Sequence, residues 1–189
     1  MEEKGKGRAI SATTPAEGDL VEWMRAYQGG DRDAFRRIYD HLAPRLRGYL
    51  ISLTFNPTLA EDLLQETFLR MHRARRSYRP PLPVVPWAFA IARNCFRMER
   101  RAFFRKWDRE DGLEGLEELP LQQLFDRVDH VALREALEAL GEDSREVVLL
   151  HHLWGFAFKD VAAMLGVSEG GARLKAHRAI LQLRKRLES

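Results

Sequence analysis

The chain contains a single cysteine, Cys95, among its 189 residues. One thiol cannot form an internal disulfide, and it cannot supply a zinc site that needs several cysteine ligands. Because Cys95 falls inside a helical pattern, we expect it to pack as a small apolar side chain, as most free cysteines do. The cysteine content therefore favours a protein of the reducing cytoplasm.

Long hydrophobic runs are also missing. No apolar segment approaches the roughly 20 residues that a membrane-spanning helix needs. Residues 1–16 are charged and polar, unlike a signal peptide. Segments with the two-residue period of a strand are absent, and so are internal repeats. We therefore predict an all-α protein that has no membrane span and is located in the cytoplasm.

The residue patterns of a catalytic site are lacking as well. The chain has no glycine loop of the kind that binds phosphate. Its histidines show no ligand spacing with cysteine or carboxylate partners: His41, His72, His130, His151, His152 and His177. The adjacent His151 and His152 would point about 100° apart on a helix, so we expect one surface and one half-buried side chain. The sequence predicts neither an enzyme nor a metal or cofactor site.

The charged residues that are present are unevenly distributed. The net charge is only +3. Acidic residues gather in 108–118, whereas basic residues gather in 93–106 and 173–186. This separation indicates two anion-binding helices split by an acidic connector. In the free protein the connector either lies against the basic 173–186 segment or is a plain solvated tether, and the tether is the favoured interpretation.

Helical spacing and helix breakers divide the chain into two helical blocks. Residues 1–18 have too few apolar side chains to offset the entropy of ordering and are expected to be a mobile tail. The first block is expected at 19–106, the connector at 107–128 and the second block at 129–189. The expected helices cover, in chain order, 19–27, 31–42, 59–75, 87–105, 131–140 and 144–154, followed by a final pair.

Two local features limit these helices. Asp31 and Thr58 are expected to cap the helices that follow them. Residues 78–86 contain four prolines. Prolines at this density remove backbone donors and push the preceding residues into extended conformations, so the sequence predicts a non-helical loop there.

The last quarter of the chain has the pattern of a helix-turn-helix. Gly166 permits a sharp turn, and Ser168 can cap the next helix. On that helix, helical spacing separates a buried stripe from an outward face. The stripe consists of Ala172, Ala176, Ala179 and Leu183, and the outward residues are Arg173, Leu174, His177, Arg178 and Arg184. A basic outward face suits a polyanion such as nucleic acid; the alternative is an ordinary solvated face.

Two helices of the first block carry faces that core packing does not explain. In 59–75, Leu64, Phe68 and Met71 form an apolar face, and the opposite face combines polar groups with one leucine: Asp62, Gln65, Glu66 and Leu69. This opposite face is either a protein-docking patch or a solvated surface with a scattered leucine. In 87–105, arginines gather on one face among aromatic residues, which suits phosphates and unstacked bases. The alternative is that these aromatic residues are simply core.

In their order and spacing, several segments together resemble the bacterial sigma factors of the extracytoplasmic-function group. These segments are 60–70, 87–94, and 144–150 leading through Gly155 to the helix-turn-helix. The similarity runs from about residue 19 to 187. It implies two helical domains, called sigma-two and sigma-four, joined by a flexible linker with no sigma-three domain between them.

The resemblance also implies partners. In that family the sigma-two domain binds the clamp helices of the largest subunit of core RNA polymerase and opens promoter DNA at the minus-ten element. The sigma-four domain reads the minus-thirty-five element and touches the flap of the second-largest subunit. Restraint by an anti-sigma factor is common in the family.

Carried over by position, the resemblance assigns three groups of residues. The polymerase-binding group is Asp62, Gln65, Glu66 and Leu69. The minus-ten group is Tyr78, Arg79, Trp87, Arg93, Asn94, Arg97, Arg100 and Arg101, and its loop takes a flipped base into a pocket. The minus-thirty-five group is Ser168, Glu169, Arg173, Leu174, Lys175, His177 and Arg178.

The chain departs from the family pattern at two places. The loop 78–86 is richer in proline than usual and lacks the Ser, Gly and Asn often found there. Leu174 stands where a polar residue is common; it can contact a thymine methyl group but cannot hydrogen-bond a base edge. The rival interpretation is a dimeric helix-turn-helix regulator with an N-terminal helical sensor domain, which has no use for the 62–70 face or the arginine helix. An interaction-only adaptor does not account for the basic final helix.

Overall fold

The computed structural model describes residues 16–107 and 130–187, and every regular element in these two ranges is a helix. This confirms the predicted all-α class. Most of the predicted tail and nearly all of the acidic connector lie outside the described residues. None of the helices in the two described ranges is long and apolar enough to cross a membrane.

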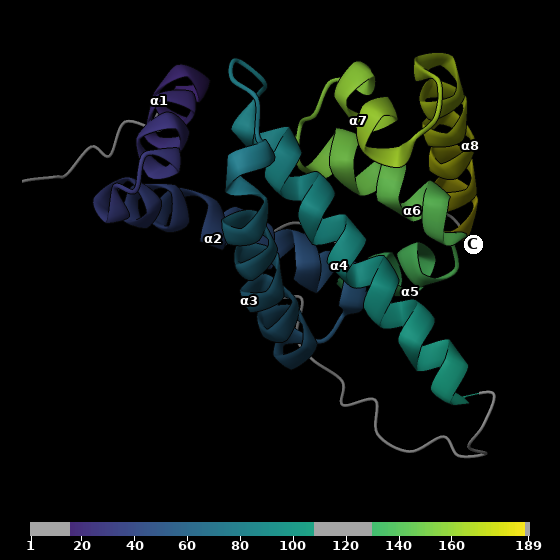
Figure 1. Cartoon of the computed structure of the whole chain (residues 1–189). Coiled ribbons are helices and arrows are strands. Elements are labelled where there is room, and N and C mark those ends of the chain that lie inside the picture. Colours follow the sequence, from purple (N-terminus) through teal and green to yellow (C-terminus); the bar gives the residue numbers. More distant parts are fainter. Residues whose placement is uncertain (1–15, 108–129, 188–189) are drawn as a thin grey trace, which may run out of the picture.

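Four helices form the N-terminal half of the molecule (Figure 1). They are α1 (Glu17–Gln28), α2 (Arg32–Thr54), α3 (Pro57–Ala74) and α4 (Val84–Trp107). Helix α2 packs against the other three, and α3 also packs against α4. The shared core includes the almost fully buried side chains of Ile38, Leu46, Tyr49, Met71 and Phe89. The bundle is therefore held together by apolar burial, which is the main driving force for packing amphipathic helices.

Helix α2 is longer than the sequence predicts, because it ends at Thr54 and not near Leu42. Its apolar stripe continues past Pro44 through the buried Leu46, Leu50 and Leu53. Burial of this stripe outweighs the single backbone hydrogen bond that a proline removes.

The N-terminal ends of α2 and α3 are capped by side chains. Asp31 accepts hydrogen bonds from the backbone N–H of Asp33 and Ala34, as predicted. Helix α3 is capped by Asn56, whose Oδ1 accepts from the backbone N–H of Leu59 at 3.0 Å. The prediction of Thr58 as the cap is wrong. The helix starts earlier in the sequence than predicted, at Pro57, because proline suits the first helical position.

Helix α4 begins at Val84, so the predicted non-helical loop is three residues too long. Pro86 lies in the first turn, where backbone N–H groups have no partner within the helix. A carboxylate from another helix satisfies two of these groups: Glu17 Oε1 accepts from the backbone N–H of Val84 and Val85. Glu17 is the first residue of α1, so α1 starts inside the segment predicted to be a tail.

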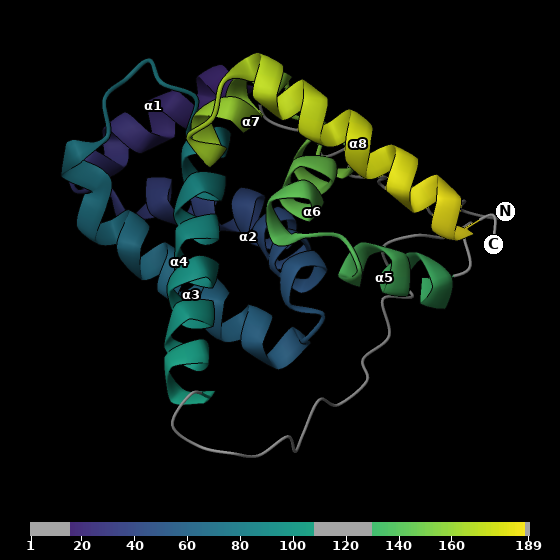
Figure 2. The same ribbon diagram turned by 90° about the vertical axis from the view of Figure 1, so that its right-hand side faces the viewer.

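The C-terminal half contains α5 (His130–Glu138), α6 (Glu142–Val148), a π-helical turn η3 (Leu149–Leu153), α7 (Phe158–Leu165) and α8 (Glu169–Leu187). Helix α8 packs against α5, α6 and α7 (Figure 2). Its predicted stripe is confirmed, because Ala172, Ala176, Ala179 and Leu183 are all buried. The three alanines let the backbone of α8 approach its neighbours closely.

The two halves of the molecule lie side by side, with α4 packed against α7. Aromatic rings fill part of this contact. The Trp154 ring lies edge-on to Tyr49, with the ring centroids 6.5 Å apart. The Phe156 ring lies edge-on to Phe89 at 4.8 Å. Residues separated by about seventy positions or more therefore share one apolar interface.

Candidate functional site

The turn between α7 and α8 has the predicted helix-turn-helix geometry. Gly166 has a φ of 68°, in the left-handed region that glycine adopts without strain, and its N–H donates to the carbonyl of Ala162. Ser168 caps α8, because its Oγ accepts from the backbone N–H of Gly171 at 3.1 Å. The sequence therefore predicted both the turn and the cap correctly.

The outward face of α8 exposes most of the predicted minus-thirty-five residues: Ser168, Glu169, Arg173, Leu174, His177 and Arg178. The Arg173 side chain is held in place on this face. Its Nη2 donates to Glu169 Oε1 at 2.6 Å, and its guanidinium lies 4.8 Å from the centroid of the Phe158 ring. A cation fixed in this way loses less side-chain entropy when it binds an anion.

Lys175 points away from that outward face. Its Nζ donates to Asp143 Oδ2 on α6 at 2.9 Å, and this hydrogen bond lowers the pKa of Asp143. The predicted contact of Lys175 with DNA stays a prediction, and in this structure Asp143 holds its ammonium group. At one residue per 100°, Lys175 falls on the side of α8 that faces α6.

Helix α3 has the two faces that the sequence predicts. Leu64, Phe68 and Met71 are buried in the bundle. On the opposite side Asp62 and Gln65 are exposed, Leu69 is 43% exposed, and Glu66 is half-buried. Glu66 Oε1 accepts from Arg70 Nε at 2.6 Å. The predicted polymerase-binding group is thus a continuous surface of one helix.

The loop before α4 buries one of the predicted minus-ten residues. Tyr78 is 2% exposed, its hydroxyl donates to the carbonyl of Leu82, and its ring lies 5.1 Å from the half-buried Trp87. Gln28 Nε2 donates to the Tyr78 carbonyl at 2.9 Å. Tyr78 therefore holds the loop in shape, and its predicted contact with DNA stays a prediction. Arg79 is exposed beside it.

The arginine face of α4 is only partly open. Asn94 and Arg101 are exposed as predicted. Arg93 is 5% exposed, because residues of the C-terminal half cover its side chain. Its Nε donates to Glu146 Oε2 at 2.6 Å, and its Nη1 donates to the Met164 carbonyl at 3.1 Å.

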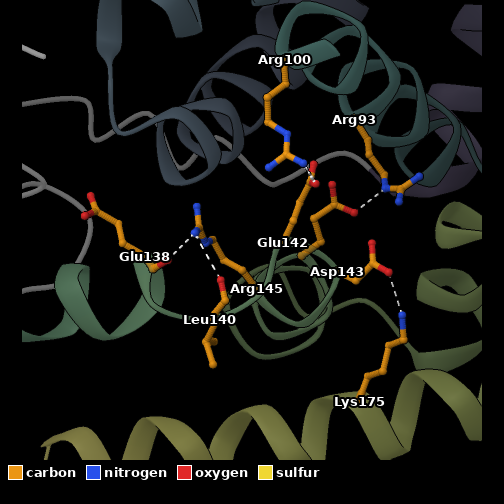
Figure 3. A network of polar contacts seen from close by, with 9 residues as sticks. Arg93, Arg100, Glu138, Leu140, Glu142, Asp143, Arg145 and Lys175 are labelled. Atoms are coloured by element: carbon orange, nitrogen blue, oxygen red, sulfur yellow. Dashed lines mark hydrogen bonds and ion pairs between the residues drawn. The ribbon is translucent and has the colours of Figure 1, made fainter. Parts of the chain in front are cut away.

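Further along the same face, Arg100 forms an ion pair with Glu142, and Arg97 is half-buried. The partners of Arg93 and Arg100 come from the C-terminal half (Figure 3). Sequence reasoning missed Glu142 and Glu146, which lie four residues apart on α6. One signal was present: Glu146 precedes a run of buried apolar residues, so a carboxylate at that position requires a cation from elsewhere.

Burial is the main influence on the pKa of Glu146. Desolvation raises the pKa of its carboxyl group, and the Arg93 guanidinium lowers it by less. The ionised carboxylate is therefore costly inside this contact unless Arg93 remains beside it.

Within the described residues, no three His, Cys, Asp or Glu side chains lie close enough to hold a metal ion. His151 is half-buried, and its Nδ1 is 2.8 Å from the Phe156 carbonyl, whereas His152 is exposed. This confirms the predicted pair of one surface and one half-buried histidine.

Comparison with known proteins decides the family. Residues 38–107 match the model of Sigma-70 region 2, and residues 130–183 match that of Sigma-70, region 4. The chain is 36% identical over 167 residues to the RNA polymerase sigma factor CarQ of Myxococcus xanthus, covering 87% of this chain and 95% of that protein. It is also 35% identical over 138 residues to the ECF RNA polymerase sigma factor EcfG of Rhodopseudomonas palustris, covering 72% and 75%. The chain belongs to the extracytoplasmic-function sigma factors.

The sigma factor also resembles a solved structure, that of the Bartonella quintana sigma factor RpoE in complex with the anti-sigma factor NepR. The TM-score is 0.73 at 28% identity, over 82% of this chain and 96% of that one. Sigma factors are transcription initiation factors, so this chain binds core RNA polymerase and directs it to promoters. The alternative of a dimeric regulator with a sensor domain is not favoured.

Proposed function

We propose that the sigma factor docks on core RNA polymerase through the exposed face of α3 formed by Asp62, Gln65, Glu66 and Leu69. An exposed leucine within a polar rim has the composition of a protein interface. The face needs no rearrangement to be reached, because its residues lie on the surface of the bundle. The clamp helices of the largest polymerase subunit are the partner that the family implies.

The C-terminal half reads the minus-thirty-five element by placing the start of α8 in the major groove. The observation that carries this proposal is the pairing of a buried alanine stripe with an outward face that contains Arg173, His177 and Arg178. Side chains near the N-terminal end of a recognition helix contact base edges in this class of motif. Leu174, which is 50% exposed, supplies an apolar contact of the kind a thymine methyl group accepts.

The N-terminal half contacts the minus-ten element through the loop before α4 and through the arginine face of α4. Arg79, Asn94 and Arg101 are exposed in the present arrangement of the two halves. Trp87 is half-buried and presents an aromatic surface next to the loop. Arg100 is also exposed and Arg97 is half-buried, whereas the buried Arg93 joins this surface only when its contact with Glu146 is released.

The sigma factor acts in the cytoplasm, where it finds core polymerase, and it is not itself an enzyme. A further proposed partner is an anti-sigma factor. The structurally similar Bartonella quintana protein was solved in complex with one.

Run-off transcription tests the proposed function. Core polymerase is mixed with the sigma factor and with genomic fragments, and the transcripts are mapped to their start sites. Initiation at discrete sites that depends on the added sigma factor supports the proposal. Sequence-specific binding of DNA by a dimer without polymerase, together with no initiation, would overturn it in favour of a regulator.

A further inference from the structure

Helix α1 holds the loop before α4, residues 78–83, at both of its ends (Figure 1). At the start of the loop, Gln28 Nε2 donates to the Tyr78 carbonyl at 2.9 Å. At its end, Glu17 Oε1 accepts from the backbone N–H of Val84. Gln28 is the last residue of α1 and Glu17 is the first. A single helix therefore spans the loop and is bonded to it on either side.

Each of these two side chains also makes a second hydrogen bond next to the loop. Gln28 Nε2 donates to the Arg75 carbonyl at 2.7 Å, in the single helical turn η1 (Arg75–Ser77) that follows α3. Glu17 Oε1 accepts from the backbone N–H of Val85 at 3.3 Å. A side chain that is bonded to two partners cannot rotate without losing both. The two attachments are therefore fixed in direction as well as in position.

Helix α1 is itself fixed to the N-terminal half of the molecule. It packs against α2 and α4, and Leu20, Met24 and Tyr27 are buried there. The Tyr27 hydroxyl forms a hydrogen bond with His72 Nδ1 on α3. The support of the loop is thus part of the core of the bundle, and α1 cannot move without disturbing that core.

The loop has little internal freedom. Three of the six residues in 78–83 are prolines, whose rings fix the backbone angle φ. The Tyr78 hydroxyl donates to the Leu82 carbonyl, and the Leu82 N–H donates to the Arg79 carbonyl at 3.1 Å. Because such a loop moves as one piece, the positions of its two ends determine where its exposed side chains point.

The side chains between the two attachments face outward. Leu82 is 55% exposed, and Arg79 is exposed beside it. A guanidinium suits a backbone phosphate, and an apolar side chain suits the face of an unstacked base. The part of the loop that is free of α1 is therefore the part with the chemistry for single-stranded DNA.

We propose that Glu17 and Gln28 are positioning residues for recognition of the minus-ten element. They hold the loop in its binding shape before DNA arrives, and a preformed loop loses less conformational entropy when it binds. Neither side chain has to touch DNA. Helix α1 precedes residues 38–107, which match Sigma-70 region 2, so that match assigns it no role. The inference rests on the proposed contact of this loop with the minus-ten element.

The first test removes the donor at Gln28. Gln28→Glu keeps the size of the side chain but places a carboxylate against two carbonyl oxygens. Its matched control is Ala26→Glu, which adds the same charge at an exposed position of the same helix. Fluorescence anisotropy measures binding of each holoenzyme to promoter fragments that carry the preferred minus-ten sequence or a single substituted base. We expect Gln28→Glu to lower the affinity for the preferred sequence by about fivefold and for the substituted sequences by less than about twofold.

The control Ala26→Glu should change both affinities by the same small factor. An unstable variant would lower both affinities equally, because it lowers the folded fraction. The ratio between preferred and substituted sequences therefore reports positioning and not stability.

The second test separates the hydrogen bonds of Glu17 from its charge. Glu17→Ala removes the acceptor, whereas Glu17→Gln keeps an oxygen that can accept from the same backbone N–H groups. We expect Glu17→Ala to reduce the discrimination between the two kinds of sequence by about threefold, and Glu17→Gln to preserve the level of the parent. Amide hydrogen exchange at Val84 and Val85 should accelerate in Glu17→Ala alone. Equal behaviour of Glu17→Ala and Glu17→Gln would show that only the charge matters and would overturn the proposal.

The same measurements separate this inference from the proposed function. If the parent discriminates between minus-ten sequences and both Gln28→Glu and Glu17→Ala preserve that discrimination, α1 only stabilises the fold and the positioning role is refuted. Equal losses on preferred and substituted sequences would refute it as well. A parent holoenzyme that initiates without any dependence on the minus-ten sequence would refute the proposed contact of the loop, and the positioning role with it.

Discussion

Glu17 Oε1 accepts a hydrogen bond from the backbone N–H of Val85 at 3.3 Å, and another from that of Val84. The first residue of α1 thus caps the N-terminus of α4, which is 67 residues further along the chain. This contact fixes the end of the loop that precedes α4 and the start of the helix that carries Trp87.

Replacing Glu17 with alanine should lower the free energy of unfolding by about 1 kcal/mol, the usual cost of losing a helix cap. Urea denaturation followed by circular dichroism measures the change. The control is Glu22→Ala in the same helix, where the lost partner is only the exposed Arg25 at 2.9 Å. We expect a loss of about 0.5 kcal/mol or less for the control. Equal losses would show that Glu17 is no more than a surface charge.

The variant Leu69→Glu, Gln65→Ala should weaken binding to core polymerase with no change in helix content. Both residues are exposed, and they lie opposite the buried Leu64, Phe68 and Met71. Loss of an interface leucine costs roughly 1.5–3 kcal/mol, or tenfold or more in affinity. Titration of a labelled sigma factor with core polymerase gives the value. The control is Leu82→Glu in the loop before α4. In the absence of DNA, this variant should bind core polymerase as well as the parent does.

Arg173→Ala should reduce transcription from the preferred minus-thirty-five sequence more than from a sequence substituted at the contacted base pair. A bidentate arginine–guanine contact is worth about 1–3 kcal/mol of discrimination. Binding of the holoenzyme to a panel of promoters with substituted minus-thirty-five elements measures the difference. Arg178→Ala is tested on the same panel for comparison. An equal loss of binding on every sequence of the panel would show that Arg173 contacts a phosphate. The base contacts would then be made by neighbouring residues.

Ala176→Leu should destabilise the C-terminal half, because Ala176 is 2% exposed at the contact of α8 with its neighbours. Overpacking of a buried site typically costs about 1–3 kcal/mol. The matched control is Ala163→Leu on α7, where the alanine is exposed and the added side chain meets solvent. Thermal unfolding compares the two variants, and equal melting temperatures would contradict close packing of α8.

The Cys95 thiol should react slowly with iodoacetamide in the native protein. Burial raises its pKa, so a smaller fraction is thiolate at pH 8 than for a free cysteine, and the reagent has little access to a side chain that is 2% exposed. We expect a rate roughly 100-fold below that of the unfolded chain. A cysteine introduced at the exposed Met98 of the Cys95→Ala protein serves as the reactive reference.

The features that the sequence predicted correctly are mostly local. The alanine stripe of α8, the turn at Gly166 and the caps at Asp31 and Ser168 depend on residues within a few positions of one another. Helical period and capping chemistry therefore predicted them. The division of α3 into an apolar face and the Leu69 face was predicted for the same reason.

Besides the local errors at the Thr58 cap and the end of α2, what the sequence could not predict is contacts between residues distant in the chain. The helical period correctly placed Arg93 on the arginine face of α4. Its partner Glu146 is 53 residues away in the chain, and no local rule brings the two together. The family resemblance placed Lys175 with the DNA contacts, whereas the position of Asp143 on α6 decides where its side chain points. Likewise, the start of α4 depends on Glu17, a residue that the sequence alone assigned to a tail.

The ion pair between Arg93 and Glu146 makes the stability of each half depend on the other. Both side chains are almost fully buried, and they come from different halves of the molecule. A fragment that contains only one half would therefore leave the remaining charge without its ionic partner. Stability measurements on an isolated half would consequently differ from those on the intact sigma factor.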